Sequence, residues 1–357
     1  MSPQGARAPA AGSAALRVSL RLNNDLPSDR FLELAVAAEE SGFFQLWVSH
    51  DLLLRSAPVL LSAAAGVTNR IQLGAGVLNP YSAHPVELAM HAATLQEVSG
   101  GRALLGIGAG AAGLLAAAGI ERPGPLERTR EAIGTCRSLL RGAPGGRPSV
   151  VTSFPVPVPL YLGAMGPRML ALAGELADGA LALLYPPEHY PLARAQVLSA
   201  AEAVGRSSDE LDLPACVWVS VDEDPEAAQG ALAEKFAFYG QDLSPYLLGR
   251  TGLRPADFAP AASALAGGEQ RLARSLVTPA MLRLGIAGTP DEVATRCAAL
   301  LEAGATHLSF GPPLGPDPVR AVQTIAREVV PALEQAALRP RATAGATPCR
   351  PSSEVQT

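Results

Sequence analysis

A glycine-rich segment after an apolar run is the first candidate for ligand chemistry. In GGRALLGIGAGAAGLLAAAGI, residues 100–120, Gly108, Gly110 and Gly113 have the spacing G-x-G-x-x-G. In dinucleotide-binding folds, glycines at this spacing let a pyrophosphate approach the backbone at a helix N-terminus. Three interpretations are open: a dinucleotide fingerprint, a tight strand-to-helix turn, and a ligand-facing loop of a different fold.

A second glycine-containing segment has the residue types of an anion site. In YLGAMGPRML, residues 161–170, two glycines flank a strand end, Pro167 begins a helix and Arg168 lies in its first turn. Backbone N–H groups at a helix N-terminus, with a guanidinium beside them, bind phosphate. A phosphate-bearing cofactor and a plain strand-to-helix turn both fit. The segment FGPPLGPDP, residues 310–318, repeats this pattern around Gly311.

Proton-transfer and metal chemistry have fewer candidates. In WVSHD, residues 47–51, His50 and Asp51 can hold or move a proton, or can merely bond the backbone of a loop. His84, Glu87 and His91 lack the H-E-x-x-H spacing of a zinc site, so no metal is predicted. There is no G-x-S-x-G nucleophile elbow.

The overall composition excludes several classes of partner and compartment. The chain has 357 residues, a net charge of -5 and no basic stripe for nucleic acid, and Lys235 is its only lysine. No window has the ~20 uninterrupted apolar residues of a membrane span. Four scattered cysteines argue against a zinc site or a disulfide framework and for a reducing cytoplasm: Cys136, Cys216, Cys297 and Cys349. We therefore expect a soluble cytoplasmic protein with a small-molecule substrate.

Apolar strand candidates alternate with amphipathic helices, which indicates βα units around a parallel sheet. Residues 1–15 and 338–357 are rich in Pro, Ala, Ser and Thr and are expected to be disordered, leaving 16–337 as one domain. Its strand candidates are 16–22, 43–49, 70–77, 102–107, 158–164, 178–185, 210–224 and 305–310. Eight such units predict an α/β protein, a (β/α)8 TIM barrel, with a helical insertion at about 223–280 between strand 7 and helix 7.

A barrel of this kind binds ligands at the carboxyl ends of its strands. The strand-end candidates are Asn23, Ser49 to Asp51, Gly76 to Asn79, Gly108 to Ala111, Gly163 to Gly166, Tyr185, Asp222 and Gly311. A dinucleotide fold would need a second strand and an acidic residue ~20 positions after the glycines. The chain instead has a proline-broken loop and a helix there. The context therefore favours a ligand-facing barrel loop.

Four longer segments carry a resemblance to a known family. They are AEESGFFQLWVSHD, TNRIQLGAGVLNPYSAHPVELAMHAATLQEVSGGRALLGIGAG, PLYLGAMGPRMLALAGELADGA and GTPDEVATRCAALLEAGATHLSFGPPLGPD. Together these segments resemble the bacterial luciferase-like superfamily, and within it the F420-dependent branch of methylenetetrahydromethanopterin reductase. The resemblance covers about residues 17–335 and includes the insertion.

The resemblance implies a TIM barrel that binds the deazaflavin coenzyme F420, or FMN in other branches, over the barrel mouth. It implies a backbone bulge with a cis non-proline peptide at Gly76–Val77 that supports the deazaflavin ring. It also implies that GAMGP holds the cofactor phosphate, with Arg168 near the anionic tail. The implied cofactor residues are Gly76, Val77, Leu78, Asn79, Gly108, Gly110, Gly163, Ala164, Met165, Gly166, Pro167, Arg168 and Gly311. The resemblance also implies that the protein forms a homodimer.

The chain also departs from this reductase pattern. The reductases carry acids where this chain has Arg21, or its neighbours, and Ala111, and they have the order Asp-His where this chain has His50-Asp51. We therefore expect hydride transfer from reduced F420 to a C=C or C=N bond of a different small, secondary-metabolite substrate, with His50 or Asp51 as the proton donor. Two alternatives remain: a reduced-FMN monooxygenase and a non-catalytic F420-binding barrel.

Overall fold

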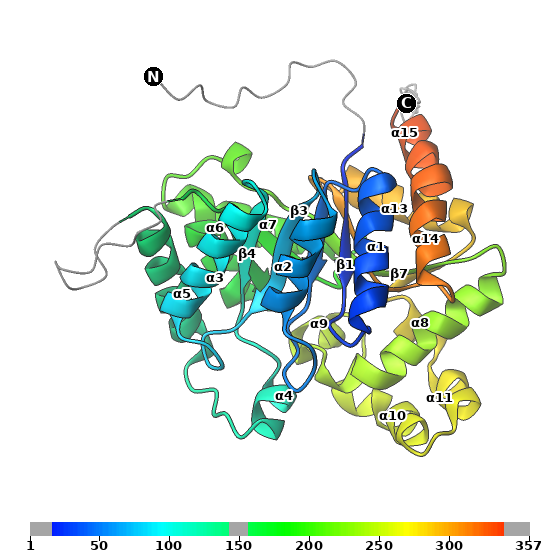
Figure 1. Ribbon diagram of the computed structural model, residues 1–357. Coiled ribbons are helices and arrows are strands. Elements are labelled where there is room, and N and C mark those ends of the chain that lie inside the picture. The colour runs from blue at the N-terminus through cyan, green and yellow to red at the C-terminus, as the bar shows by residue number, and fades with distance from the viewer. Residues whose placement is uncertain (1–15, 143–155, 339–357) are drawn as a thin grey trace, which may run out of the picture.

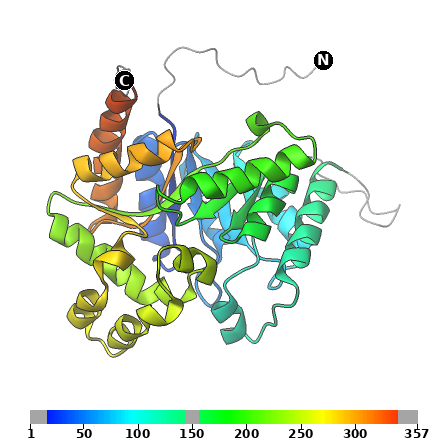
Figure 2. The same cartoon turned by 180° about the vertical axis from the view of Figure 1, so that it is seen from behind.

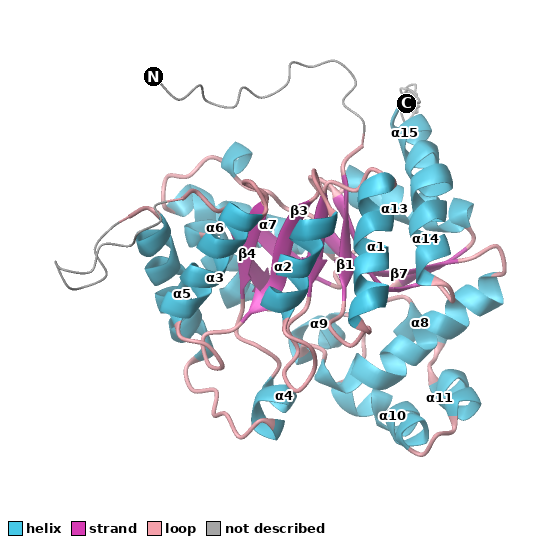
Figure 3. Ribbon diagram, in the orientation of Figure 1, coloured by secondary structure: helices cyan, strands magenta, loops and turns pink. Residues whose placement is uncertain are grey.

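The computed structural model describes residues 16–142 and 156–338. The two segments expected to be disordered, 1–15 and 338–357, lie outside the described residues, as does Cys349, except that Leu338 ends a helix. Helices surround a central sheet, and several shorter helices gather at one end of it (Figures 1 and 3).

Parallel strands form the centre of the molecule. They are β1 (Val18–Leu22), β2 (Gln45–Val48), β3 (Gln72–Leu78), β4 (Ala103–Ile107), β5 (Leu160–Ala164), β6 (Gly179–Leu183), β7 (Ala215–Val221), β8 (Ile286–Gly288) and β9 (Leu308–Leu314). Neighbours pair in parallel from β1 through β7, and β9 pairs with both β7 and β1, so the sheet closes. The predicted eight-stranded barrel is confirmed. The sequence did not predict β8, which pairs with the end of β7.

Most helices return the chain between consecutive strands. They are α1 (Ser28–Glu40), α2 (Ala57–Val67), α3 (Pro85–Val98), α4 (Ala112–Ala117), α5 (Pro125–Leu140), α6 (Pro167–Leu176), α7 (Tyr190–Ala203) and α13 (Pro290–Glu302). Two more helices, α14 (Pro318–Thr324) and α15 (Val330–Leu338), follow the last strand. A π-helical segment, Ile325–Val329, joins the last two. Proline occupies the first turn of many of them, where its missing N–H leaves no hydrogen bond unmade.

The predicted insertion is present between β7 and α13. It contains α8 (Pro225–Tyr239), α9 (Pro245–Arg250), α10 (Ala259–Ala266), α11 (Gln270–Leu276) and α12 (Pro279–Leu282). These helices lie at the lower end of the barrel in Figure 1 and again in the reverse view of Figure 2. Because β1 runs from the amino-terminal end at the top toward this end, the insertion lies at the carboxyl ends of the strands, which we call the mouth.

Side chains alternate along each strand between two separate apolar cores. In β1, Val18, Leu20 and Leu22 pack in the layer between strands and helices. A second cluster fills the inside of the barrel: Trp47, Leu104, Tyr161, Leu181 and Cys216, with Val77 and Leu183 packed against it. Because both faces of each strand are buried in this way, the strands appear in the sequence as nearly continuous apolar runs.

A polar network fills the opposite, amino-terminal end of the barrel. His307 Nδ1 lies 3.2 Å from Asp212 Oδ1, and Tyr161 donates its hydroxyl to Asp212 Oδ2 at 2.7 Å. Burial by itself would raise the pKa of Asp212, but His307, Thr306 and Tyr161 together outweigh it and lower that pKa to about 2. In barrels this end contributes to stability, whereas the mouth carries chemistry.

Candidate functional site

The end of β3 forms a bulged wall at the mouth. The register between β3 and β4 shifts between Ala75 and Leu78, and the Gly76–Val77 peptide is cis, as the sequence resemblance predicted. Gly76 and Val77 are half-buried, whereas Leu78 is buried and pairs with Ile107 of β4. The bulge therefore presents backbone and the Val77 side chain on the inner side of the barrel mouth.

Three glycines from two other strands make room for Val77. A Cβ atom on Gly108 would lie 2.6 Å from Val77 Cγ2, and one on Gly163 would lie 2.9 Å from Val77 Cγ1. A Cβ on Gly106 would lie 3.3 Å from Val77 Cγ1 and 2.3 Å from the Ala75 carbonyl oxygen. We call Gly106, Gly108 and Gly163 the Val77 niche. Gly108, the first glycine of the G-x-G-x-x-G segment, thus makes room for a protein side chain at the mouth.

Asn79 and Gly110 continue this wall at the ends of β3 and β4. Asn79 is buried, and its Oδ1 accepts hydrogen bonds from the backbone N–H groups of Tyr81 and Ser82. Gly110 has a φ of +69°, and a Cβ there would lie 3.2 Å from Asn79 Cβ. Gly110 is therefore required both by its left-handed conformation and by the close approach of Asn79.

The segment from Gly163 to Arg168 joins β5 to α6 and leaves open space at the helix N-terminus. Gly166 precedes α6, and a Cβ on it would meet no atom within 4 Å. Pro167 begins the helix, Arg168 is exposed, and the Met165 carbonyl accepts a hydrogen bond of 2.9 Å from the Tyr185 hydroxyl. Ala164, in contrast, is buried in the strand–helix layer. Unpaired N–H groups and a guanidinium at a helix start suit a phosphate.

The loop after β2 contains the predicted proton donors, and Asn24 holds it. The Asn24 side chain is fully buried, donates to the carbonyls of Asp51 and Arg55 and accepts from the Asp51 backbone N–H. His50 Nδ1 accepts from the backbone N–H of Ala57 at 3.2 Å, so its proton belongs on Nε2. Burial lowers the pKa of His50; Asp51 opposes this effect and His91 adds to it. His50 is therefore mostly neutral at pH 7.

The insertion covers this loop and completes the mouth. Tyr239, at the end of α8, donates its hydroxyl to Asp51 Oδ2 at 2.9 Å. The ammonium group of Lys235 lies 3.8 Å from the ring centroid of Tyr239 and 5.1 Å from that of Trp218. Burial, Asp51 and Asp242 are among the causes that raise the pKa of Tyr239, so its hydroxyl stays protonated and donates. The insertion thus contributes polar groups to the site.

Gly311 faces an arginine inside the barrel. A Cβ on Gly311 would lie 2.5 Å from Nη2 of Arg21 in β1. Arg21 is 9% exposed, and Nη2 donates to the Val217 carbonyl at 2.9 Å. The missing side chain at Gly311 therefore gives Arg21 its space within the barrel.

The remaining strand-end candidates lie in other settings. Asp222 pairs with Arg320, whose Nη2 lies 2.8 Å from Asp222 Oδ2. Ala111 is exposed directly before α4, and a Cβ on Gly113 would lie 3.0 Å from Asp242 Oδ1 in the insertion. Sequence reasoning missed Asn24, Trp218, Lys235 and Tyr239 as mouth residues. For Lys235 and Tyr239, the available signal in the sequence was a single lysine four residues before a tyrosine on one predicted helix.

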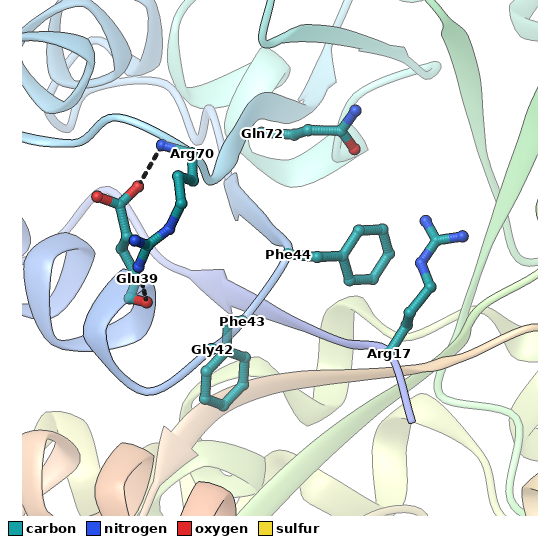
Figure 4. Close-up of a pocket in the computed structure, with 7 residues that line it drawn as sticks. All are labelled: Arg17, Glu39, Gly42, Phe43, Phe44, Arg70 and Gln72. Atoms are coloured by element: carbon teal, nitrogen blue, oxygen red, sulfur yellow. Dashed lines mark hydrogen bonds between the residues drawn. The ribbon is translucent and has the colours of Figure 1, made fainter. Parts of the chain in front are cut away.

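Two surface cavities lie away from the mouth. One, of about 410 Å³, opens at the amino-terminal ends of β1 to β3, where the Arg17 guanidinium covers the Phe44 ring at 3.9 Å (Figure 4). There Glu39 is engaged by the backbone N–H groups at residues 69–71. The other, of about 340 Å³, lies between α2 and α3. Neither contains the predicted site residues, apart from Leu78 in the second.

Metal ligation has no candidate cluster among residues 16–142 and 156–338. His84 precedes α3, and its Nδ1 accepts from the backbone N–H of Val86 at 3.3 Å. Over the same ranges, no helix combines the length and the apolar character needed to cross a membrane.

Comparison with known proteins identifies the family. The family model described as luciferase-like monooxygenase matches residues 10–307. The chain belongs to the luciferase-like monooxygenase family. Its predicted resemblance to this superfamily is thereby confirmed.

Three named proteins are similar to this chain over most of its length. The 5,10-methylenetetrahydromethanopterin reductase of Methanolobus tindarius is 34% identical over 85% of this chain and 98% of its own length. The F420-dependent glucose-6-phosphate dehydrogenase of Kineococcus radiotolerans is 30% identical over 85% of this chain and 93% of its own. The solved coenzyme F420-dependent tetrahydromethanopterin reductase of Methanopyrus kandleri superposes with a TM-score of 0.80 at 31% identity, covering 90% of this chain and 100% of that one.

Proposed function

We propose that this luciferase-like protein is an F420-dependent oxidoreductase that passes hydride from reduced deazaflavin to a C=C or C=N bond of a small secondary-metabolite substrate. The observation that carries the proposal is the wall of Gly76 and Val77 in its glycine niche, at the same mouth as the open N-terminus of α6. Whole-length likeness to F420-dependent enzymes, two of them described above, supports the choice of cofactor.

The residues at the mouth fit F420 in type and position. The N–H groups around Gly166 to Arg168 and the exposed Arg168 guanidinium suit its phosphate. The half-buried backbone at Gly76 and Val77 offers a surface on which a ring can rest. When bound, reduced F420 supplies the hydride. The chain's own residues would bind and orient the two reactants and exclude water from between them.

His50 is the candidate proton donor, and Asp51 is its neighbour. In the neutral ring, Nδ1 of His50 accepts the Ala57 N–H and Nε2 carries the hydrogen, which can bond to substrate; the proton that is transferred is the second one, present when His50 is protonated. Asp51 accepts the Tyr239 hydroxyl and is therefore better suited to hold a charge than to donate a proton. We propose that Asp51 orients α8 over the mouth and raises the fraction of protonated His50, which it favours electrostatically.

Binding and turnover with two cofactors test this proposal. The purified protein is titrated with F420 and with FMN, and consumption of reduced F420 is then followed anaerobically with candidate unsaturated substrates. Tight F420 binding with anaerobic turnover supports the proposal. Turnover with reduced FMN that requires oxygen would identify a monooxygenase, F420 binding without turnover a non-catalytic barrel, and binding of neither would refute the cofactor assignment.

We also propose a cytoplasmic homodimer that associates through α2 and α3. Cys136, Cys216 and Cys297 are buried and free, which supports a reducing compartment. Val59 in α2 and Met90 in α3 are 67% and 60% exposed on two neighbouring helices, and exposed apolar patches are typical of interfaces. Light scattering should give a dimer mass for the wild type and a monomer mass for Val59→Glu/Met90→Glu. Leu272→Glu, on the distant α11, is the matched control.

A further inference from the structure

Two cations lie at the mouth without an ionic partner. Arg21 is 9% exposed, makes one hydrogen bond through Nη2, and its Nε has no hydrogen-bond partner. Lys235 contacts the rings of Trp218 and Tyr239. Among the described residues, neither cation has a carboxylate oxygen within 4.0 Å. A buried guanidinium with an unpaired donor is costly unless a counter-charge binds.

Both cations lie over the same side of the barrel. Arg21 occupies the space beside Gly311 of β9 and bonds the Val217 carbonyl of β7. Trp218, the next residue of β7, is the register partner of Gly311, and Lys235 lies over its ring. Burial lowers the pKa of Lys235 to about 8; Asp25 and Asp51 oppose this effect and Arg21 adds to it. The two positive charges are therefore close enough to repel each other.

Asp25 and Asp51, the two carboxylates that favour the charged form of Lys235, do not neutralise this pair. Asp51 accepts the hydroxyl of Tyr239 and lies in the loop held by Asn24. Asp25 is exposed, so its charge is screened by solvent. The pKa of Lys235 remains below its ordinary value despite both of them. An oxyanion placed between Arg21 and Lys235 would give Nε a hydrogen-bond acceptor and both cations a counter-charge.

We propose that Arg21 and Lys235 form an oxyanion subsite in the mouth, so that the small molecule taken by this barrel carries a carboxylate or phosphate group. The assignment of that molecule as the redox substrate rests on the proposed function; the binding of an oxyanion does not. Arg21 would form the directional hydrogen bonds, and Lys235 would add a compact charge held in place by Trp218 and Tyr239.

Because Lys235 is the only lysine of the chain, its ammonium can be observed directly. In protein labelled with ¹³C at the lysine ε-carbon, a single resonance reports the protonation of Lys235. Inorganic phosphate and acetate are added separately at millimolar concentrations in a weakly coordinating buffer. We expect one or both to raise the pKa of Lys235 by about one unit, because a bound anion favours the charged form by about tenfold. The stronger effect distinguishes phosphate from carboxylate recognition.

Substitutions of the two cations, compared with a control at a distant arginine, distinguish anion binding at the subsite from the general effect of losing one positive charge. Arg21→Met and Lys235→Met should each weaken binding of the effective anion at least tenfold by calorimetry. The matched control Arg271→Met removes an exposed arginine of α11 and should leave binding unchanged. Equal effects of Arg21→Met and Arg271→Met, or no movement of the Lys235 resonance with either anion, overturn the proposal. Should Arg21→Met fail to fold, the wild-type titration and Lys235→Met decide the question.

A third titration includes F420. If the anion still binds to protein saturated with F420, the subsite belongs to the second reactant, as proposed. If F420 displaces the anion competitively, the two cations serve the cofactor and the proposal is wrong. Protein that binds phosphate or acetate at Lys235 but does not bind F420 would refute the proposed function and leave the oxyanion subsite standing.

Discussion

Replacing Gly108 by alanine tests whether the Val77 niche builds the wall of the mouth. The added Cβ would lie 2.6 Å from Val77 Cγ2, closer than carbon atoms approach without repulsion. Valine has one strongly preferred rotamer in most settings, so the side chain and the Gly76–Val77 backbone must shift together. Overpacking of this kind costs about 1–3 kcal/mol. We expect Gly108→Ala to lower the free energy of unfolding by that amount and to weaken F420 binding.

A second substitution, at Val77, tests whether the contact between Gly108 and Val77 causes the expected loss of stability. Val77→Ala removes both Cγ atoms and leaves Val77 Cβ 3.4 Å from the new methyl group, an ordinary contact. Gly108→Ala and Val77→Ala should therefore be strongly non-additive, with the double variant more stable than their sum predicts by about 1–3 kcal/mol. Urea denaturation of the four proteins measures this coupling, and calorimetry with F420 measures its effect on binding.

Two further glycines provide controls for the cycle. Gly106→Ala would place its Cβ 2.3 Å from the Ala75 carbonyl oxygen, so Val77→Ala should not rescue it. Gly166→Ala, with no atom within 4 Å of its Cβ, should leave stability near the wild-type value. Additivity of Gly108→Ala and Val77→Ala within about 0.5 kcal/mol would refute the niche. Rescue of Gly106→Ala by Val77→Ala would refute the assignment of contacts.

Four other predictions follow from the site and the barrel. Asp212→Asn should lower the free energy of unfolding at pH 7 by about 2–3 kcal/mol. Because the pKa of Asp212 in the folded protein is lowered to about 2, this contribution is present above about pH 4 and is lost as the pH falls toward 2. The unfolding free energies of variant and wild type, measured over this acid range, should therefore converge. His50→Gln should reduce kcat with reduced F420 by about 10²-fold or more, and wild-type kcat should rise as pH falls toward the lowered pKa of His50; an unchanged pH profile would exclude it as the donor. Tyr239→Phe should weaken substrate binding more than F420 binding, because it frees Asp51 from α8, and equal losses would contradict this role. Arg168→Gln should weaken F420 binding with a smaller dependence on salt, whereas an unchanged affinity would remove it from the cofactor site.

The sequence by itself determined the barrel and the location of its mouth. Alternating apolar strands and amphipathic helices can bury their surfaces in few arrangements, and glycines at strand ends mark places of close approach to the backbone, by a ligand or by another side chain. The segments that resemble the luciferase-like family also determined the bulge at Gly76–Val77. These features are local in sequence, because each depends on one strand, its turn and the helix that follows.

Only the tertiary structure decided what the glycines and the insertion do. Val77 meets Gly108 and Gly163 because β3 pairs with β4 and β4 pairs with β5 in the folded sheet. Tyr239 reaches Asp51 across 188 residues of sequence because the insertion returns over the mouth. No local propensity encodes such contacts, since they depend on how strands twist and how a distant helix packs. The sequence shows every residue type of the site, but only packing brings these side chains into contact.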